Sequence, residues 1–423
     1  MKVLFLVYSP QNSLEYFAER RQTNFPWVDA MILELSKSNN ELAIGLVVPI
    51  RSANFQKWIH EEISIYGVPD LKVPQSPVSR LTNRARLSQG SEIISHTLEA
   101  ITDFNPDIIQ VFGTENIFGI IQLYTKVPVV IHFQGSVLVV ATKWFVGLTK
   151  WEQFRALSFR KMLTRSGSFF EYFTFRERGQ REEVIMKQCR YFIGRTSFDR
   201  KLTGFFSPEA SYYLCQEFIR EDFFKHKWEV PRTNNITCIS ILKGVTYKGL
   251  DLLLDASAIL NRYAAIKIEF KICGVSENEE VVTILKRRNY GGDIWSQFIF
   301  LGKLDSKSLI DELVSSNFYI HPSYMENSSN SICEAMALGM PVVATNAGGT
   351  NSLINDDLDG ILVQEGDPYS IAAAIIELST NYHKAISIGN RARERAVQRH
   401  HPSKLKEEMI SIFRSIISER ELS

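Results

Sequence analysis

The sequence lacks the features that mark several common protein classes. Its 48 lysines and arginines nearly balance 47 acidic residues, so the formal net charge of +1 gives no case for nucleic-acid binding. The five cysteines are scattered and form no CxxC pair, which excludes a zinc ribbon and argues against a disulfide framework. The apolar run in residues 1–10 is too short for a signal peptide or a membrane span. We therefore expect a globular protein of a reducing cytoplasm.

Short apolar runs alternate with helix-period stretches along most of the 423 residues. Runs such as 2–8 and 107–113 lack polar alternation, which is typical of strands buried on both faces. Two series of such runs, each interleaved with helices, predict an α/β fold of two Rossmann-like domains facing each other across a cleft. We place these domains at 1–218 and 219–400, followed by a helix at 401–423 that packs back on the first domain.

The most informative segment is 321–367, which follows a predicted strand ending near His321. The loop after that strand lies at the carboxyl edge of a parallel sheet, where open α/β folds bind their ligands. The next residues predict a helix that starts near Ser331 and ends at Gly339, with Pro341 soon after. The unpaired amides at such a helix start, together with the positive end of the dipole, suit a diphosphate.

Two glutamates, Glu326 and Glu334, flank this helix start at a spacing of eight residues. Carboxylates accept hydrogen bonds from neighbouring hydroxyls, so two of them on either side of a phosphate cradle suit a nucleotide sugar. Each has a plainer interpretation. Ser331 and Glu334 also fit a capping box, and Glu326 also fits an exposed loop acid.

This segment resembles the signature of glycosyltransferase family 4, whose members are retaining enzymes with the GT-B fold. The family carries two glutamates eight residues apart, here Glu326 and Glu334, followed by the run at 335–349 that is rich in alanine, valine and glycine. The resemblance implies transfer of a hexosyl group from a UDP- or GDP-sugar to a glycan or lipid-linked acceptor, without a cofactor. Within the family, the segments 326–331 and 193–200 resemble a bacterial branch that builds surface polysaccharides.

The resemblance also implies a role for each matching residue. Lys243 and Lys248 take the places of family cations that stabilise the developing diphosphate charge without a metal. Glu326 holds the hydroxyls of the donor sugar, Glu334 the ribose diol, and His132 contacts the sugar or orients the acceptor. The remaining donor-binding positions are Gly302, Ser328, Ser329, Asn330, Ser331, Gly348, Gly349 and Thr350.

Other interpretations of these residues stay open at this point. The two lysines also fit solvated surface charges, and His132 also fits a hydrogen-bonded histidine at a strand end. Residues 355–360 are typical of a polar turn rather than of a metal-binding DxD motif. His400 lies among charged helical residues without a third ligand nearby, so we expect it at the surface and expect no metal site.

The chain departs from the family pattern at residues 8–27, which contain no glycine. In the family a glycine-rich loop follows the first strand and lets the backbone approach the donor phosphates. This departure keeps a non-catalytic, nucleotide-sugar-binding subunit of a transferase complex open as a second class of function. The enzyme alternative is a sugar-nucleotide epimerase, which would release an altered sugar nucleotide without an acceptor.

Residues 143–175 interleave cations with aromatics. A basic amphipathic stretch of this kind can lie on an anionic membrane, so 143–161 predicts a peripheral contact at the inner face of the plasma membrane. The alternative is a helix pair whose aromatics face the core and whose cations face water.

Overall fold

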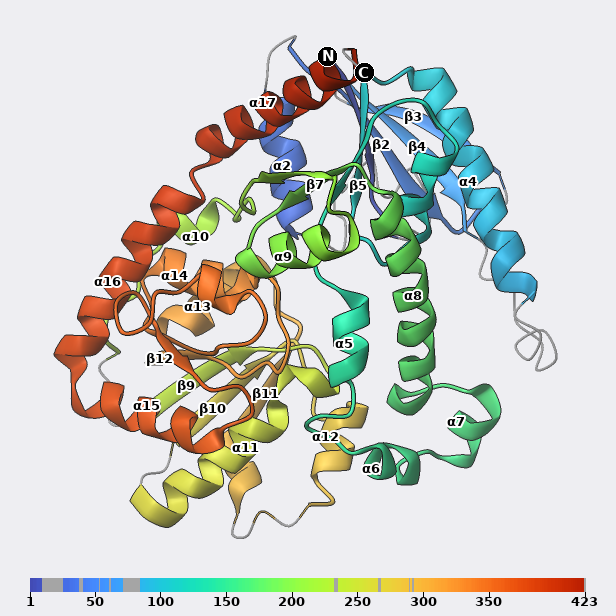
Figure 1. Ribbon diagram of the computed structural model, residues 1–423. Helices are drawn as coiled ribbons and strands as arrows, with labels where there is room; N and C mark the ends of the chain where they lie inside the picture. Colours follow the sequence, from blue (N-terminus) through green and yellow to red (C-terminus); the bar gives the residue numbers. More distant parts are fainter. Residues whose placement is uncertain are drawn as a thin grey trace.

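The computed structural model describes residues 1–9, 26–37, 41–52, 54–60, 62–70, 84–231, 235–264, 268–288, 290 and 293–421. Two sheets with helices on their faces form two bodies that meet near the middle of the molecule (Figure 1). This architecture confirms the predicted pair of Rossmann-like α/β domains.

The first domain is built on an eight-stranded sheet in the order β3-β4-β2-β1-β5-β6-β7-β8. All neighbouring strands pair in parallel except β3 and β4. Every residue of β5 is buried, because helices cover both faces of the sheet. The strands are β1 (Lys2–Leu6), β2 (Ala43–Ile50), β3 (Gln56–His60), β4 (Ile63–Pro69), β5 (Ile108–Phe112), β6 (Val129–His132), β7 (Tyr191–Gly194) and β8 (Ser211–Leu214). The helices that cover the sheet include α2 (Pro26–Ser36), α4 (Arg84–Phe104), η1 (Ile117–Leu123) and α9 (Ser197–Phe206).

The second domain has a six-stranded parallel sheet in the order β11-β10-β9-β12-β13-β14. Its strands are β9 (Ile236–Ile241), β10 (Ile268–Cys273), β11 (Phe298–Gly302), β12 (Phe318–His321), β13 (Val342–Thr345) and β14 (Ile361–Val363). Its helices are α10 (Asp222–Lys225), η2 (Thr246–Lys248), α11 (Leu250–Ile259), η3 (Leu260–Ala264), α12 (Glu280–Leu285), η4 (Ile294–Gln297), α13 (Ser306–Val314), α14 (Asn330–Leu338), η5 (Thr350–Ser352), α15 (Pro368–Thr380) and α16 (Tyr382–Arg399). Because β12 lies at the centre of the sheet, the loop that follows it opens at the middle of the carboxyl edge.

The last helix, α17 (Pro402–Glu421), returns to the first domain (Figure 1). Leu405, Met409 and Phe413 recur every four residues and join the same core cluster as Val3 and Phe5 of β1. This packing confirms the predicted helix that crosses back.

A long helical excursion separates β6 from β7. It comprises α5 (Val137–Lys143), α6 (Lys150–Arg155), α7 (Phe159–Thr164) and α8 (Ser168–Gln188). Leu148, between α5 and α6, belongs to the core cluster of the second domain. The excursion therefore starts in the first domain and reaches the second. In the described part of the chain, no helix combines the length and apolar character needed to cross a bilayer.

Candidate functional site

Helix α14 starts directly after the loop at the centre of the second sheet. Its N-cap is Ser329 and it ends at Gly339, whose φ of 81° favours glycine. The predicted end of the helix is therefore correct, but the start lies before Ser331. The Ser331 hydroxyl lies within hydrogen-bonding distance of Tyr319, whose hydroxyl donates to it at 2.7 Å. The capping-box interpretation is wrong, because Ser331 is inside the helix rather than at its cap.

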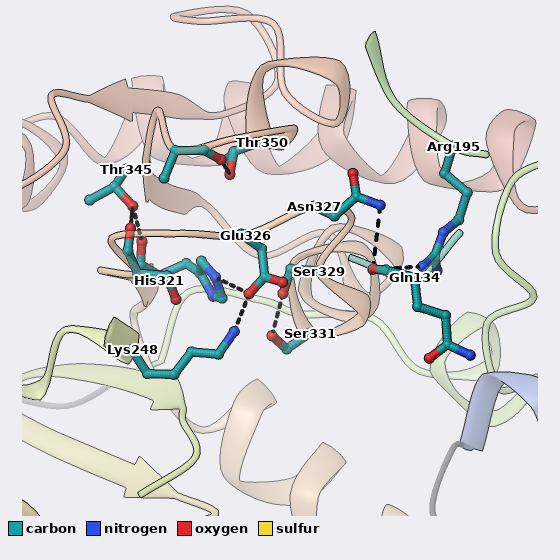
Figure 2. Close-up of polar contacts among 12 residues, drawn as sticks. Gln134, Arg195, Lys248, His321, Glu326, Asn327, Ser329, Ser331, Thr345 and Thr350 are labelled. Atoms are coloured by element: carbon teal, nitrogen blue, oxygen red, sulfur yellow. Dashed lines mark hydrogen bonds and ion pairs between the residues drawn. The ribbon is translucent and has the colours of Figure 1, made fainter. Parts of the chain in front are cut away.

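Glu326 lies in this loop between two basic side chains (Figure 2). The ammonium group of Lys248 contacts Glu326 Oε2, and Nε2 of His321 lies 3.2 Å from the same oxygen. Burial alone would raise the pKa of Glu326, but the charge of Lys248 and the bond to His321 hold it well below its ordinary value. Glu326 is therefore a fixed anion with a counter-ion, not an exposed loop acid.

Lys248 is likewise not a solvated surface charge. Burial lowers its pKa, but the facing carboxylate of Glu326 outweighs burial and raises it. The turn that carries it needs Gly249, because φ there is 79° and a Cβ atom would lie 2.1 Å from the carbonyl oxygen of Pro322. The turn that carries Lys248 is also joined to the loop that carries Glu326, because the Tyr324 amide donates to the carbonyl of Tyr247 at 2.9 Å.

Lys243 precedes this turn and is exposed. Desolvation of its ammonium group and the nearby charge of Lys248 lower its pKa. Within the described residues it forms no ion pair, so the surface-charge interpretation stays open for this lysine. The negative charge of Glu115, which belongs to the first domain, acts in the opposite direction and raises the pKa of Lys243.

Glu334 lies in α14 and pairs with Arg220, a residue that the sequence analysis did not identify. Arg220 donates from Nε at 3.0 Å and from Nη2 at 2.7 Å to the same carboxylate oxygen, and its Nη1 donates to Ser306 at 2.6 Å. Burial raises the pKa of Glu334, and Arg220 opposes that shift. No described residue donates to the second oxygen, Oε2, of Glu334 or to Oε1 of Glu326. Each glutamate is thus held by one oxygen while the other can accept a ligand hydroxyl.

The serines of the loop differ from one another in what their hydroxyls do. Ser328 donates to the buried carboxylate of Glu217, so its hydroxyl is not directed at a phosphate as predicted. The hydroxyls of Ser329 and Ser331 lie 2.9 Å apart beside Glu326 (Figure 2). The Asn330 side chain has a buried oxygen, Oδ1, without a partner among the described residues. Hydroxyls that can face a phosphate here therefore come from Ser329 and Ser331.

Gly348 and Gly349 support the Glu326 loop through close backbone packing. A Cβ atom on Gly348 would lie 1.9 Å from the Glu326 carbonyl oxygen, and one on Gly349 would lie 2.3 Å from that of Asn327. The Gly349 amide donates to the Glu326 carbonyl at 3.0 Å. The glycine pair thus fixes the backbone from which Glu326 projects.

Thr350 and Gly302, two other predicted donor-binding positions, form hydrogen bonds within the protein. The hydroxyl of Thr350, which is buried, donates to the carbonyl of Ala347 at 2.8 Å. Gly302 ends β11 with a φ of 62°, and its carbonyl accepts the Gly274 amide at 2.6 Å. The side chain of Thr350 and the carbonyl of Gly302 therefore serve the local fold.

Asn327 joins the second domain to the first. Its Oδ1 accepts from the Thr196 hydroxyl at 2.6 Å, and its Nδ2 donates to Asp199 at 3.1 Å. Nδ2 also lies 3.4 Å from the Gln134 carbonyl, which accepts from Arg195 as well (Figure 2). Nothing local to Asn327 in the sequence signals these partners, which lie over 100 residues away.

His132 ends β6 and is fully buried. One ring nitrogen, Nδ1, lies 3.2 Å from the Gln110 amide nitrogen, and the ring packs edge-on against Trp27. Burial and the charge of Arg195 lower the pKa of His132 well below its ordinary value. Its Nε2 has no partner among the described residues. The ring is therefore neutral, and only one of its two nitrogens has a hydrogen-bond partner among the described residues. No hydrogen bond joins His132 to Glu326 within that part of the chain.

The carboxyl edge of the first sheet carries a second acidic cluster that the sequence did not indicate. Glu182 of α8 is buried and accepts from Thr114 at 2.5 Å, from Ser136 at 3.1 Å and from the Leu138 amide at 2.7 Å. Glu115 follows β5, and burial together with the charge of Glu182 raises its pKa to about 7. The glycine-free loop falls largely at 10–25, outside the described residues.

His400 is buried rather than exposed, so the prediction for this residue is wrong. Among the described residues, Glu217, Cys333 and His400 offer ligand atoms within 4.8 Å of one another. However, Nδ1 of His400 is 2.8 Å from the Glu217 carbonyl. The charges of Arg195 and Arg399 help to hold the pKa of Glu217 low despite its burial. These two cations would repel a metal ion, and the cluster is an internal charge network.

The sequence profile described as "Glycosyl transferases group 1" matches residues 221–395. A putative colanic acid biosynthesis glycosyltransferase of Salmonella typhimurium is 26% identical over 185 residues, which cover 42% of this chain and 45% of that protein. An amylovoran biosynthesis glycosyltransferase of Erwinia amylovora is 25% identical over 188 residues, or 43% of this chain and 45% of that protein. The matches span less than half the length of these relatives.

Solved structures extend the likeness to the whole chain. Sucrose-phosphate synthase from Thermosynechococcus elongatus superposes with a TM-score of 0.71 at 14% identity, covering 99% of this chain and 100% of that one. Anabaena HepE in complex with UDP-glucose gives a TM-score of 0.62 at 15% identity, covering 98% and 100%. At these identities the likeness establishes the GT-B fold.

Proposed function

We propose that this chain, which belongs to the group 1 glycosyltransferases through residues 221–395, moves a hexosyl group from a UDP- or GDP-sugar to a glycan or lipid-linked acceptor. We further propose that the product serves bacterial surface-polysaccharide synthesis. The names of the Salmonella and Erwinia relatives, which assign those proteins to colanic acid and amylovoran biosynthesis, support this proposal. The comparisons give no support to the epimerase alternative.

The observation that carries the proposal is the placement of two glutamates around the start of α14, each with only one carboxylate oxygen held by a cation. Glu326 is held by Lys248 and Glu334 by Arg220, and each retains a free carboxylate oxygen. Between them lie the amides of the helix start, which no described side chain caps, and the hydroxyls of Ser329 and Ser331. A hexose, a diphosphate and a ribose present hydroxyls, negative charge and hydroxyls in this same order. The Anabaena protein was solved in complex with UDP-glucose, which supports this class of donor.

In the proposed reaction an acceptor hydroxyl attacks the anomeric carbon while the bond from that carbon to the donor phosphate breaks. The acceptor proton passes to a donor phosphate oxygen, and the nucleoside diphosphate leaves. Attack from the face of the leaving group retains the anomeric configuration. Lys248, Lys243 and the α14 amides stabilise the charge that develops on the diphosphate, so the site can act without a metal.

The first domain would supply the acceptor side of the reaction. Its carboxyl edge meets the Glu326 loop through Asn327, and Glu115 is close enough to Lys243 for their charges to interact. We assign the acceptor to the edge that holds Glu115 and His132. We propose the cytoplasm as the site of this reaction.

A thermal-shift panel of UDP-, GDP-, ADP- and CMP-sugars tests the donor assignment. We expect one of the UDP- or GDP-sugars to stabilise the chain by about 2.7 kcal/mol at a concentration 100 times its dissociation constant. The same donor should raise the melting temperature of the Glu326→Ala variant less, because the donor sugar no longer has the Glu326 carboxylate as a hydrogen-bond partner. If none of the four classes changes the melting temperature, the proposed site is wrong. If a donor binds but releases no nucleoside diphosphate even slowly to water, the chain is a binding subunit rather than an enzyme.

A further inference from the structure

Residues 144–167, which contain α6 and α7, form an arm between α5 and α8. In Figure 1 the arm lies at the end of α8 that points away from the first sheet, beside α12. Its inner side is anchored to the second domain. Leu148 enters that domain's core, the Thr246 hydroxyl donates to the Trp144 carbonyl, and Arg288 pairs with Glu152 at 2.6 Å. The arm therefore has a defined orientation on the protein.

The outer side of the arm exposes large apolar side chains. Trp151 is 71% exposed, Phe159 is 77% exposed and Leu163 is 65% exposed. Helix α7 has no buried residue at all, so it contributes nothing to either core. The other exposed apolar residues of the arm are Val146, Phe154 and Met162. So many exposed apolar side chains within one short segment indicate an interaction site.

The arm also carries exposed positive charge without ion-pair partners among the described residues. Lys150, Arg155, Arg160 and Arg165 are exposed and form no ion pair with any described residue. The only acid of the arm is Glu152, and it already accepts from Arg288. The solvent-exposed surface of the arm thus combines apolar side chains with cations, and its one acid is already paired.

We propose that the arm docks on the surface of an anionic lipid bilayer. The apolar tips would enter the boundary between headgroups and acyl chains, and the four arginine and lysine side chains would meet the lipid phosphates. The competing view, in which aromatics of this segment face the core, holds for Trp144, which is buried, but fails for Trp151 and Phe159.

Docking of the arm goes beyond the transfer reaction and stands without it. If the proposed function also holds, docking has a consequence for the acceptor. The base of the arm contacts Thr246, two residues from Lys248, so a bilayer bound to the arm would hold the donor site in a fixed relation to lipid-linked saccharides.

Flotation of the full chain with lipid vesicles tests this inference without any activity assay. The vesicles contain either phosphatidylcholine alone or phosphatidylcholine with about one-third phosphatidylglycerol. We expect the chain to float with the anionic vesicles at low salt and to be released by about 0.5 M salt, which screens exposed charges. The double variant Trp151→Ser with Phe159→Ser should reduce the bound fraction at least fivefold, and Arg155→Ser with Arg160→Ser should act in the same direction.

The control is Phe205→Ser with Tyr263→Ser, which removes two aromatics that are 76% and 65% exposed elsewhere on the chain. The control should float like the unchanged chain, and all variants should keep its melting temperature because none removes a core residue. The inference is overturned if the chain does not float with anionic vesicles at low salt. It is also overturned if the arm variants bind as well as the control, or if the arm instead captures a protein and leaves vesicles unbound.

Discussion

The carboxyl edges of the two sheets place the same residue type in opposite electrostatic settings. On the second edge Glu326 faces Lys248, and its pKa lies well below its ordinary value although the side chain is mostly buried. On the first edge burial and the charge of Glu182 raise the pKa of Glu115 to about 7. One acid is therefore a fixed anion, whereas the other is close to half protonated near neutral pH.

This difference matches the ligand that each edge would hold. Charges that are already paired and oriented need no reorganisation when a charged ligand arrives, which is how enzymes stabilise a charge that develops during reaction. The diphosphate is common to all nucleotide-sugar donors, and the paired edge suits it. An acid that can gain or lose a proton, or gain a hydroxyl partner, suits the acceptor, which varies from one transferase to another. We therefore associate the second edge with the donor and the first with the acceptor.

The largest effect should come from breaking the pair on the second edge. Lys248→Ala leaves the carboxylate of Glu326 buried without its cation, which typically costs about 3–5 kcal/mol of folding stability. Turnover should fall at least roughly tenfold, or about 1.4 kcal/mol of transition-state stabilisation. Urea unfolding and the rate of nucleoside diphosphate release measure the two effects.

Lys243→Ala is the matched control for stability, because Lys243 is exposed and lacks an ion pair within the described residues. Its unfolding free energy should stay within about 0.5 kcal/mol of the unchanged chain. If the two substitutions lowered the unfolding free energy equally, the ion pair of Lys248 would not distinguish it from Lys243.

The next effect concerns the backbone that carries Glu326. Gly349→Ala would place a methyl group 2.3 Å from the Asn327 carbonyl oxygen, so the loop must shift. We expect a loss of about 1–3 kcal/mol in unfolding free energy and weaker donor binding. Gly204→Ala is the control, since α9 leaves open space at that position and alanine favours a helix by up to about 1 kcal/mol. A Gly349→Ala variant as stable as the control would contradict the packing described for the loop.

The sequence predicted the second edge better than the first for a physical reason. The loop after β12, the helix it leads to and the glycines after β13 are close together in the chain, so their spacing is visible as a motif. Arg220 reaches Glu334 from 114 positions away, and the Asn327 contacts cross between domains. His400 was expected at the surface because its neighbours are charged, yet the turn from α16 into α17 buries it against Glu217. Such pairings arise from tertiary packing and leave no local pattern.

A smaller effect tests the second ion pair of the donor edge. Arg220→Lys keeps the charge but loses the planar group that donates to Glu334 and Ser306 together. We expect the affinity for the donor nucleotide to fall about 5- to 10-fold, or about 1–1.4 kcal/mol. Calorimetric titration with the free nucleoside diphosphate would measure the change. If the substitution lowered the affinity for the sugar-bearing donor but not for the free nucleoside diphosphate, Arg220 would not act on the ribose side of the site.

The last prediction tests the first edge through its pH dependence. The folded-state pKa of Glu115 is about 7, above the ordinary value of 4.5, so the folded chain holds this proton more tightly than the unfolded chain does. Stability linked to Glu115 is therefore fully present below about pH 4.5 and is lost as the pH rises through about 7. Because Glu115→Gln cannot lose that proton, its stability advantage over the unchanged chain should rise from about 1 kcal/mol near pH 5 toward about 3 kcal/mol near pH 8, since a pKa shift from 4.5 to about 7 corresponds to about 3.4 kcal/mol.

Urea unfolding at both pH values, with exposed Glu209→Gln as the control, measures this difference. Buried histidines do not obscure it. The pKa of His400 is about 4 in the folded chain, so its contribution is lost as the pH falls from about 6.5 through about 4, equally in the variant and in the unchanged chain. That loss cancels when the two are compared at the same pH. A difference between Glu115→Gln and the unchanged chain that is constant from pH 5 to pH 8 would mean that Glu115 is as firmly ionised as Glu326, and the contrast between the two edges would disappear.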